Sequence, residues 1–137
     1  MLDEGLEIVR GVWSGQPVHF HGAHYSIDGV RFLPRPVRAA GIPIWAATES
    51  IRGRPVRRAA GLDGIVPIDV EPADVPQLID DVGRDRVERG VFDIVCVSQD
   101  DNAERWEAVG ATWWLRELDW DRPVADAVAV VGRGPLG

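Results

Sequence analysis

The sequence predicts an α/β fold, a partial TIM barrel made of a (βα)4 half-barrel with parallel strands, and two observations lead to it. Four short apolar runs recur along the chain, each followed by a stretch of helical character: residues 42–48, 63–69, 93–98 and 112–118. Most of each run is apolar without clean alternation, which is typical of strands buried on both faces of a parallel sheet. A closed (β/α)8 barrel needs eight such units and about 250 residues, whereas this chain has 137. We therefore expect half a barrel, preceded by an N-terminal helix and a β-hairpin insertion.

The N-terminal part is expected to hold that helix and that hairpin. Apolar residues recur at three- and four-residue spacing from Leu2 to Trp13, which predicts an amphipathic helix. Residues 18–33 are rich in strand formers and contain two turn candidates, Gly22-Ala23 and Asp28-Gly29, so they are expected to form the hairpin insertion. A proline-containing linker, residues 33–41, leads into the first run.

Helices are expected after each of the four runs. A short one is predicted over residues 55–60, and a longer one from Glu71-Pro72 to Gly90. The third is expected to be capped by Asp100 or Asp101, and the last to begin at Pro123. We expect Ile44, Ile65, Val95 and Leu115 in one central sheet, with helices packed onto it through Val75, Leu78, Ile79, Val82, Val124, Val128 and Val131.

Composition limits the class of protein. A chain of 137 residues with 45% apolar residues predicts one globular domain, residues 1–137. No apolar run is long enough for a membrane span, and the first residues are acidic without the apolar segment of a signal peptide, so we expect a cytoplasmic protein that does not bind membranes. The net charge of −7 argues against nucleic acid as a partner. The single cysteine, Cys96, lies within an apolar run and is expected to be a buried thiol without a disulfide.

Specific stretches of the chain resemble the C-terminal half of the luciferase-like monooxygenase family. The resemblance covers LDEGLEIVRGVWSGQPVHFHGAHYSIDGVRFLPRPV, then IPIWAATES and RRAAGLDGIVPI, and finally GATWWLREL with its closing helix. It implies a (β/α)8 barrel that uses reduced FMN or the deazaflavin F420 for oxygen insertion or hydride transfer, and that is commonly a dimer. The first half of the barrel, which supplies much of the ring pocket in the family, has no counterpart here, so catalytic residues are not assigned.

The strongest candidate site is the segment after the first run, Thr48, Glu49 and Ser50, with Arg52 and Arg54 behind it. Barrel chemistry gathers where strands end, and backbone N–H groups, a hydroxyl and guanidinium groups are good phosphate donors. Four arginines lie within seven residues of an otherwise acidic chain: Arg52, Arg54, Arg57 and Arg58. In the luciferase-like family the matching loop holds the cofactor phosphate, and Glu49-Ser50 resemble the phosphate-binding motif of that loop. The alternative is a helix cap at Ser50 beside solvated arginines.

Two further sets of polar residues are weaker candidates for a functional site. His19, His21 and His24 have spacing that suits zinc, but no cysteine or convincing carboxylate completes a ligand set, so no metal site is expected. Polar residues near other strand ends, namely Asp69, Gln99, Arg116 and Glu117, could include a general base, but strand-end salt bridges are the simpler interpretation.

Trp113 and Trp114 are adjacent in the last run and must point to opposite faces of the sheet. One of them faces the interior of the half-barrel, where an apolar surface would be open to water and would need a partner. Two functions stay open at this point. The chain is part of a flavin- or F420-dependent oxidoreductase completed by self-association or by a complementary half-barrel, or it is a non-catalytic half-barrel that dimerises and keeps only a vestigial phosphate loop.

Overall fold

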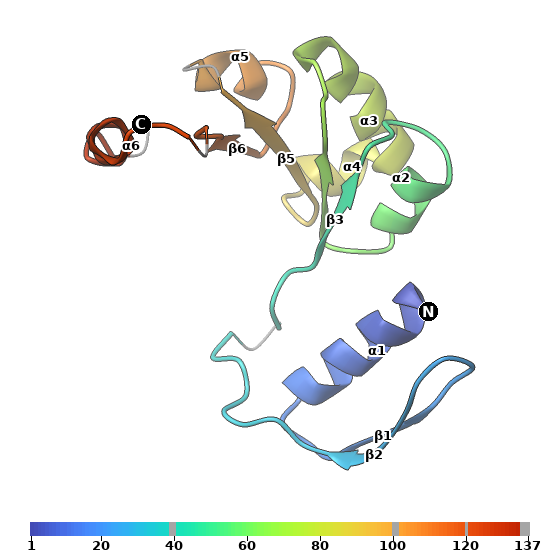
Figure 1. Ribbon diagram of the computed structural model, residues 1–137. Coiled ribbons are helices and arrows are strands. Elements are labelled where there is room, and N and C mark those ends of the chain that lie inside the picture. The colour runs from blue at the N-terminus through green and yellow to red at the C-terminus, as the bar shows by residue number, and fades with distance from the viewer. Residues whose placement is uncertain (39–40, 100–101, 120, 135–137) are drawn as a thin grey trace. The chain divides into compact units, whose positions relative to one another are not determined.

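The computed structural model describes residues 1–38, 41–99, 102–119 and 121–134, and they form two compact units, Met1–Ile42 and Pro43–Gly137 (Figure 1). The first unit contains α1 (Leu2–Trp13), β1 (Val18–His21) and β2 (Ser26–Val30). The two strands pair antiparallel, with His21 opposite Ser26 and Val18 opposite Val30. The predicted N-terminal helix and hairpin are therefore both confirmed.

One carboxylate ties the helix of the first unit to its hairpin. Glu4 Oε2 accepts hydrogen bonds from the backbone N–H groups of His24, at 3.0 Å, and Tyr25, at 3.2 Å, in the loop between β1 and β2. Gly22 makes room for this approach, since a Cβ atom there would lie 2.3 Å from the same oxygen. These hydrogen bonds lower the pKa of Glu4, the bond from His24 contributing most.

The second unit is built on a four-stranded parallel sheet in the order β3-β4-β5-β6. The strands are β3 (Trp45–Thr48), β4 (Gly64–Pro67), β5 (Asp93–Ser98) and β6 (Trp113–Arg116). All four predicted strands are present, although three are shorter than the apolar runs that predict them. Order along the sheet equals order along the chain, as in successive βα units of a barrel, so the expected half-barrel fold is confirmed.

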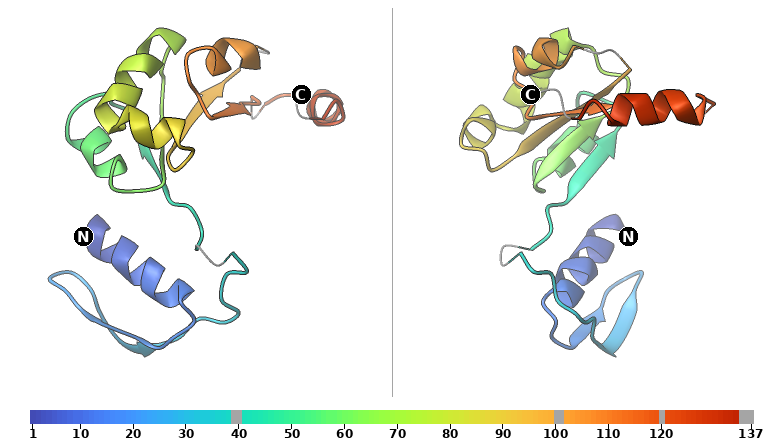
Figure 2. Two further views of the ribbon diagram at one scale, coloured as in Figure 1. Left: turned by 180° about the vertical axis from the view of Figure 1, so that it is seen from behind. Right: turned by 90° about the vertical axis from the view of Figure 1, so that its left-hand side faces the viewer.

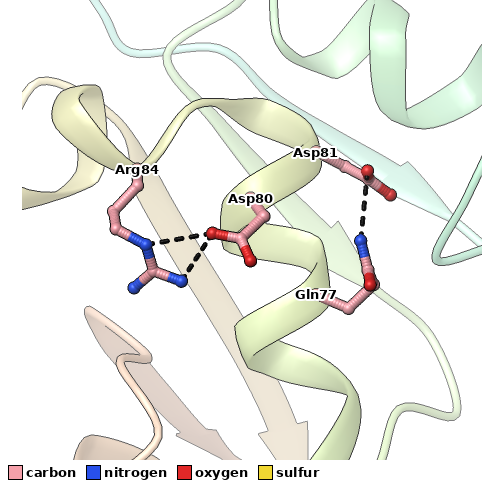
Figure 3. Close-up of polar contacts among 4 residues, drawn as sticks. All are labelled: Gln77, Asp80, Asp81 and Arg84. Atoms are coloured by element: carbon pink, nitrogen blue, oxygen red, sulfur yellow. Dashed lines mark hydrogen bonds and ion pairs between the residues drawn. The ribbon is translucent and has the colours of Figure 1, made fainter.

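Helices α2 (Arg54–Ala59), α3 (Val75–Val82), α4 (Arg84–Glu88) and α5 (Ala103–Glu107) cover one face of this sheet (Figure 2). The core between helices and sheet contains residues from every strand-helix unit except the last: Val56, Ala59, Ile65, Val70, Val75, Leu78, Ile79, Val82, Phe92, Ile94, Cys96 and Trp106. The buried stripe of α3 is thus as predicted. Its outer side is polar, where Asp80 pairs with Arg84 and Gln77 donates to Asp81 (Figure 3).

The predicted helix from residue 71 to residue 90 is divided into three pieces. A short 3₁₀ turn, Pro72–Asp74, precedes α3, and Gly83 then separates α3 from α4. Gly83 has φ 102°, a left-handed conformation that a helix cannot contain. Arg86 of α4 stacks over the Phe92 ring at 4.8 Å and donates to the carbonyls of Ala60 and Leu62, so the break places α4 against the end of α2.

The cap of α5 differs from the expected one. Asn102 is the N-cap, and its side-chain oxygen accepts a hydrogen bond of 3.0 Å from the Arg105 N–H. Asp100 and Asp101, the expected caps, lie outside the described residues. Asparagine has the short side-chain acceptor that an N-cap requires, so α5 begins one or two residues later than an aspartate cap predicts, and the predicted capping residue is wrong.

The two adjacent tryptophans of β6 point to opposite faces, as predicted. Trp114 packs against the core under the helices, whereas Trp113 is 52% exposed on the other face. Val97 and Leu115, neighbours in the β5–β6 pairing, are exposed on that same face. We call this face, made of Trp45, Ala47, Val66, Val95, Val97, Trp113 and Leu115, the inner face, because it would line the interior of a closed barrel.

The expectation for the last helix is wrong in one respect. Helix α6 (Val124–Val131) begins just after Pro123, as predicted. Its valines do not pack inward, however: Val124, Val128 and Val131 are 78%, 63% and 71% exposed. Helix α6 extends beyond the β6 edge of the sheet and does not join the layer of the other helices (Figure 1). Apolar spacing predicts which residues share a helix face, but not whether that face has a neighbour.

Candidate functional site

The predicted phosphate segment lies at the carboxyl end of β3. Thr48 is the last residue of the strand and is buried, the loop of residues 49–53 follows, and α2 begins at Arg54. The carboxyl ends of parallel strands are where barrel and open-sheet proteins bind their ligands. The fold therefore brings Thr48, Glu49, Ser50, Arg52 and Arg54 to the end of the sheet where a ligand is expected.

Two hydroxyl groups fix the conformation of this loop. Thr48 Oγ1 accepts a hydrogen bond of 3.1 Å from the Ser50 N–H and donates one of 2.9 Å to the Ser50 carbonyl. Ser50 Oγ repeats the pattern one step further, accepting from the Arg52 N–H at 3.2 Å and donating to the Arg52 carbonyl at 2.8 Å. The loop is thus two consecutive hydroxyl-closed turns. We expected the backbone N–H groups of residues 50–52 to point outward, but those of Ser50 and Arg52 are engaged within the loop.

The guanidinium groups remain as the donors of this site. Arg52 and Arg54 are exposed, and within the described part of the chain neither guanidinium group forms a hydrogen bond or an ion pair. Glu49 is exposed beside them. Ser50 does not cap α2; its N-cap is Gly53, at φ 82°, and no side-chain cap is present. The alternative interpretation of Ser50 as a helix cap is therefore wrong, and its hydroxyl instead shapes the loop.

A pocket of about 210 Å³ adjoins the start of α2. It is lined by Gly53, Val56 and Arg57 from the α2 region and by Asp81 from α3. A Cβ atom on Gly53 would meet nothing within 4 Å, so the loop is open on this side. Because Arg57 and Asp81 carry opposite charges, this pocket offers a phosphate less than the Arg52–Arg54 side does.

A second polar group, at the ends of β5 and β6, centres on a residue that sequence reasoning missed. Asp119 accepts a hydrogen bond of 3.0 Å from Gln99 and lies 3.9 Å from Arg122. The Glu117 N–H donates to the Ser98 carbonyl and continues the strand pairing, so Glu117 is placed by backbone contacts. The Nε of Arg122 is buried. The ion pair at this end joins Asp119 and Arg122, neither of which was among the predicted strand-end residues, and the sequence signal for Asp119 was its place just after the last run.

The amino end of the sheet carries a third polar cluster, which the sequence pattern did not predict. Asp93 Oδ2 accepts from Trp45 Nε1 at 3.1 Å, and Asp93 Oδ1 accepts from Trp113 Nε1 at 3.2 Å. The two indoles lie 5.9 Å apart between centroids and are tilted by 52°. The amino end of a barrel serves stability rather than chemistry, so this cluster is assigned to holding the strands together.

The remaining candidates are placed by their contacts. Cys96 is fully buried in β5, and desolvation raises its pKa to about 11, so the thiol stays protonated near neutral pH. His19 pairs with Asp28, and His21 Nδ1 lies 2.8 Å from the Ser26 hydroxyl. Among the described residues no group of three histidine, cysteine or acidic side chains is placed to hold a metal ion. None of the helices in the described ranges has the length and apolar character needed to cross a bilayer.

Comparison with known proteins assigns the family. The family model for luciferase-like monooxygenases matches residues 1–134. Uncharacterized proteins of Mycobacterium bovis and of two Mycobacterium tuberculosis strains are each 33% identical over an alignment of 118 positions that covers 81% of this chain. The chain spans about 40% of the length of these relatives. The parallel half-barrel and the family match over nearly every residue agree, and this chain belongs to the luciferase-like monooxygenase family.

Proposed function

We propose that this chain is the cofactor-phosphate-holding part of a flavin- or F420-dependent oxidoreductase or monooxygenase. The observation that carries the proposal is the loop after β3, where Thr48 and Ser50 close two turns and two exposed arginines follow. The family is generally dependent on a flavin or on F420, and both FMN and F420 contain a phosphate group. We assign Thr48, Glu49, Ser50, Arg52 and Arg54 to that phosphate, and residues 1–137 to one C-terminal half of a (β/α)8 barrel.

The roles of these residues differ. Arg52 and Arg54 supply positive charge and N–H donors in a geometry that suits phosphate oxygens. Thr48 and Ser50 act by positioning, because their hydroxyls hold the backbone that carries the arginines. Glu49 sets the local charge balance by opposing the arginines. When bound, the reduced cofactor would supply the electrons for oxygen insertion or hydride transfer, and this chain's contribution is to anchor its phosphate end.

Activity requires more of the barrel than the residues of this chain form. The inner face is apolar and exposed at Val97, Trp113 and Leu115, so a ring bound there would meet water on its open side. We propose that a homodimer or a complementary half-barrel covers it, with no membrane or nucleic acid involved. We also propose a cytoplasmic location, supported by the lone buried cysteine.

A second function rests on the same loop. The hydroxyls and the N–H groups of Ser50 and Arg52 satisfy one another, so the loop keeps its shape without a ligand. This favours a non-catalytic half-barrel in which the phosphate loop is vestigial.

Titration of FMN and F420 distinguishes the two functions. We expect weak binding to the wild-type chain, weakened about tenfold or more in Arg52→Ala/Arg54→Ala, because each charge-assisted contact contributes over 1 kcal/mol. Ser50→Ala should weaken binding less, since Ser50 acts through the backbone. Arg10→Ala, an exposed arginine of α1, is the matched control and should bind like the wild type. Equal affinities for all variants would remove the loop as the phosphate site, and no binding to any would favour the non-catalytic function.

A further inference from the structure

Three arginines of the second unit lack a polar partner, and all three lie in the stretch of residues 52–57. In the part of that unit that the structure describes, the guanidinium groups of Arg52, Arg54 and Arg57 form no hydrogen bond and no ion pair. The other arginines described there are engaged by carbonyl groups, carboxylates or further contacts: Arg58, Arg84, Arg86, Arg89, Arg105, Arg116, Arg122 and Arg133. Unpaired cations gathered in one exposed stretch favour an anionic ligand.

The proposed phosphate site uses only part of this positive charge. Residues 49–59 hold four arginines and one glutamate, a formal charge of +3 in a chain whose net charge is −7. Arg54 and Arg57 lie three positions apart on α2, so their side chains share a helix face, about 4.5 Å apart along the axis. Arg52 and Arg54 are assigned to the phosphate, which leaves Arg57 for a second anionic group of the same ligand.

The pocket of about 210 Å³ at the start of α2 connects Arg57 with the phosphate site. Its lining includes Gly53, which is the residue between Arg52 and Arg54, together with Arg57 and Asp81. The lining belongs to α2, α3 and the loop before α2, and none of it comes from an edge of the sheet. A ligand held by its phosphate at Arg52 and Arg54 therefore extends into this pocket with the groups that follow the phosphate.

The two charged residues of the pocket are not paired with each other. Arg57 is exposed without a partner in the described part of the chain, whereas Asp81 Oδ1 accepts a hydrogen bond of 3.3 Å from Gln77 Nε2 (Figure 3). The second carboxylate oxygen of Asp81 accepts no hydrogen bond from the described residues. A ligand group that carries a carboxylate and an N–H on the same carbon atom satisfies both sides, because the carboxylate accepts from Arg57 and the N–H donates to Asp81.

A γ-linked glutamate has this arrangement, and its presence distinguishes the two cofactors. FMN ends at its phosphate, whereas F420 continues beyond its phosphate through a lactyl group into γ-linked glutamates, each with an amide N–H and a carboxylate on its α-carbon. We propose that Arg57 and Asp81 form a subsite for a glutamate of this tail, so that the chain selects F420 over FMN. The inference rests on the proposed function, because the phosphate at Arg52 and Arg54 directs the tail to the pocket.

Titration of the full chain with three ligands, followed by the fluorescence of the ligand, is the first test. The ligands are FMN, F420 with several glutamates, and the form of F420 that ends at its phospholactyl group. We expect glutamylated F420 to bind about tenfold more tightly than the other two, because its carboxylate forms a charge-assisted contact with Arg57. The difference should shrink as salt is added, since the contact is exposed.

Substitutions separate the tail subsite from the phosphate site. Arg57→Ala should bind glutamylated F420 no more tightly than the form without glutamates, and Asp81→Ala should weaken the glutamylated form about threefold by removing the acceptor. Arg52→Ala/Arg54→Ala should weaken both forms by the same factor, because both contain the phosphate. Arg10→Ala, which also removes an exposed arginine, is the matched control and should bind all three ligands as the wild type does.

Tetra-γ-glutamate, added without any cofactor, tests the subsite independently of the phosphate site. The peptide should shift the NMR signals of the Arg57 Nε–H and of the Gly53 amide, because both residues line the pocket. In Arg57→Ala the shift of the Gly53 amide should disappear. Arg57 is exposed and has no partner in the described part of the chain, so the circular dichroism of this variant should match that of the wild type.

The possible results separate this proposal from the phosphate assignment. Equal affinities for the two forms of F420, or a difference that persists in Arg57→Ala, would overturn the tail subsite and leave the phosphate assignment standing. A peptide that shifts the Gly53 and Arg57 signals, together with no binding of any cofactor, would support the subsite and remove the proposed phosphate site. A peptide that leaves both signals unchanged would overturn the subsite.

Discussion

The indole of Trp45 reaches across a neighbouring strand to the carboxylate of Asp93, where its N–H donates a hydrogen bond of 3.1 Å to Oδ2. Trp45 begins β3 and Asp93 begins β5, and β4 lies between them. The residue of β4 that the indole must cross is Gly64, which pairs with both Trp45 and Asp93. The absence of a side chain on one strand thus allows a contact between the two strands that flank it.

Replacement of Asp93 by Ala should destabilise the sheet. The substitution leaves the indole N–H groups of Trp45 and Trp113 without their acceptor, which we expect to cost about 1–3 kcal/mol in the free energy of unfolding. Urea unfolding followed by tryptophan fluorescence measures it. Asp85→Ala, which removes only an exposed pair with Arg89, should change stability by less than about 0.5 kcal/mol. Equal effects of the two substitutions would show that the indole contacts contribute nothing.

Gly64→Ala should destabilise the protein, although the substitution adds only one methyl group. A Cβ atom there would lie 2.6 Å from Trp45 Cδ1 and 2.8 Å from the Asp93 carbonyl oxygen, so the indole and the backbone must shift. We expect a loss of roughly 1–3 kcal/mol, as for other overpacked sites. Gly5→Ala in α1, where the nearest atom is 4.0 Å away, is the control and should not destabilise the protein. A Gly64→Ala protein with wild-type stability would contradict this packing.

Truncation of Leu78 should lower the free energy of unfolding much more than truncation of Val128. Leu78 is fully buried between α3 and the sheet, so Leu78→Ala should lower the free energy of unfolding by about 2–5 kcal/mol. Val128 is 63% exposed, so in the monomeric chain Val128→Ala should cost less than about 0.5 kcal/mol. Thermal unfolding under dilute conditions measures both. A large cost for Val128→Ala there would mean that α6 packs on its own chain.

Stability of the α1–hairpin unit should depend on pH through Glu4. Hydrogen bonds from the backbone of His24 and Tyr25 hold the pKa of Glu4 below its usual range in the folded state. The stabilisation is therefore fully present above the ordinary glutamate pKa of about 4.3 and is lost as pH falls through the lowered folded value. Titration of the Glu4 carboxyl by NMR should show the lowered pKa. In Glu4→Gln the acid-dependent change in the His24 and Tyr25 amide signals should disappear, and its persistence would contradict the assignment.

Local pattern was enough to predict most of the fold and the place of the candidate site. The spacing of Leu2, Leu6, Val9 and Trp13 gave a helix with the observed bounds, and the run of residues 93–98 gave a strand with the observed bounds. Adjacency alone placed Trp113 and Trp114 on opposite faces. The position of Thr48 at a strand end followed from the order of apolar run, loop and helix. These features depend on residues close together in the chain, where helical and strand periodicity operate.

The tertiary structure decided what depends on residues far apart. Trp45 and Asp93 are 48 positions apart, and only the strand order brings them into contact over Gly64. The Ser50 and Arg52 N–H groups are taken by hydroxyls because of the turn that the loop adopts, which the residue types alone did not specify. The valines of α6 have the spacing of a packed helix, yet they are exposed because α6 extends past the β6 edge of the sheet. Periodicity determines which side chains share a face, and the arrangement of distant segments determines what that face meets.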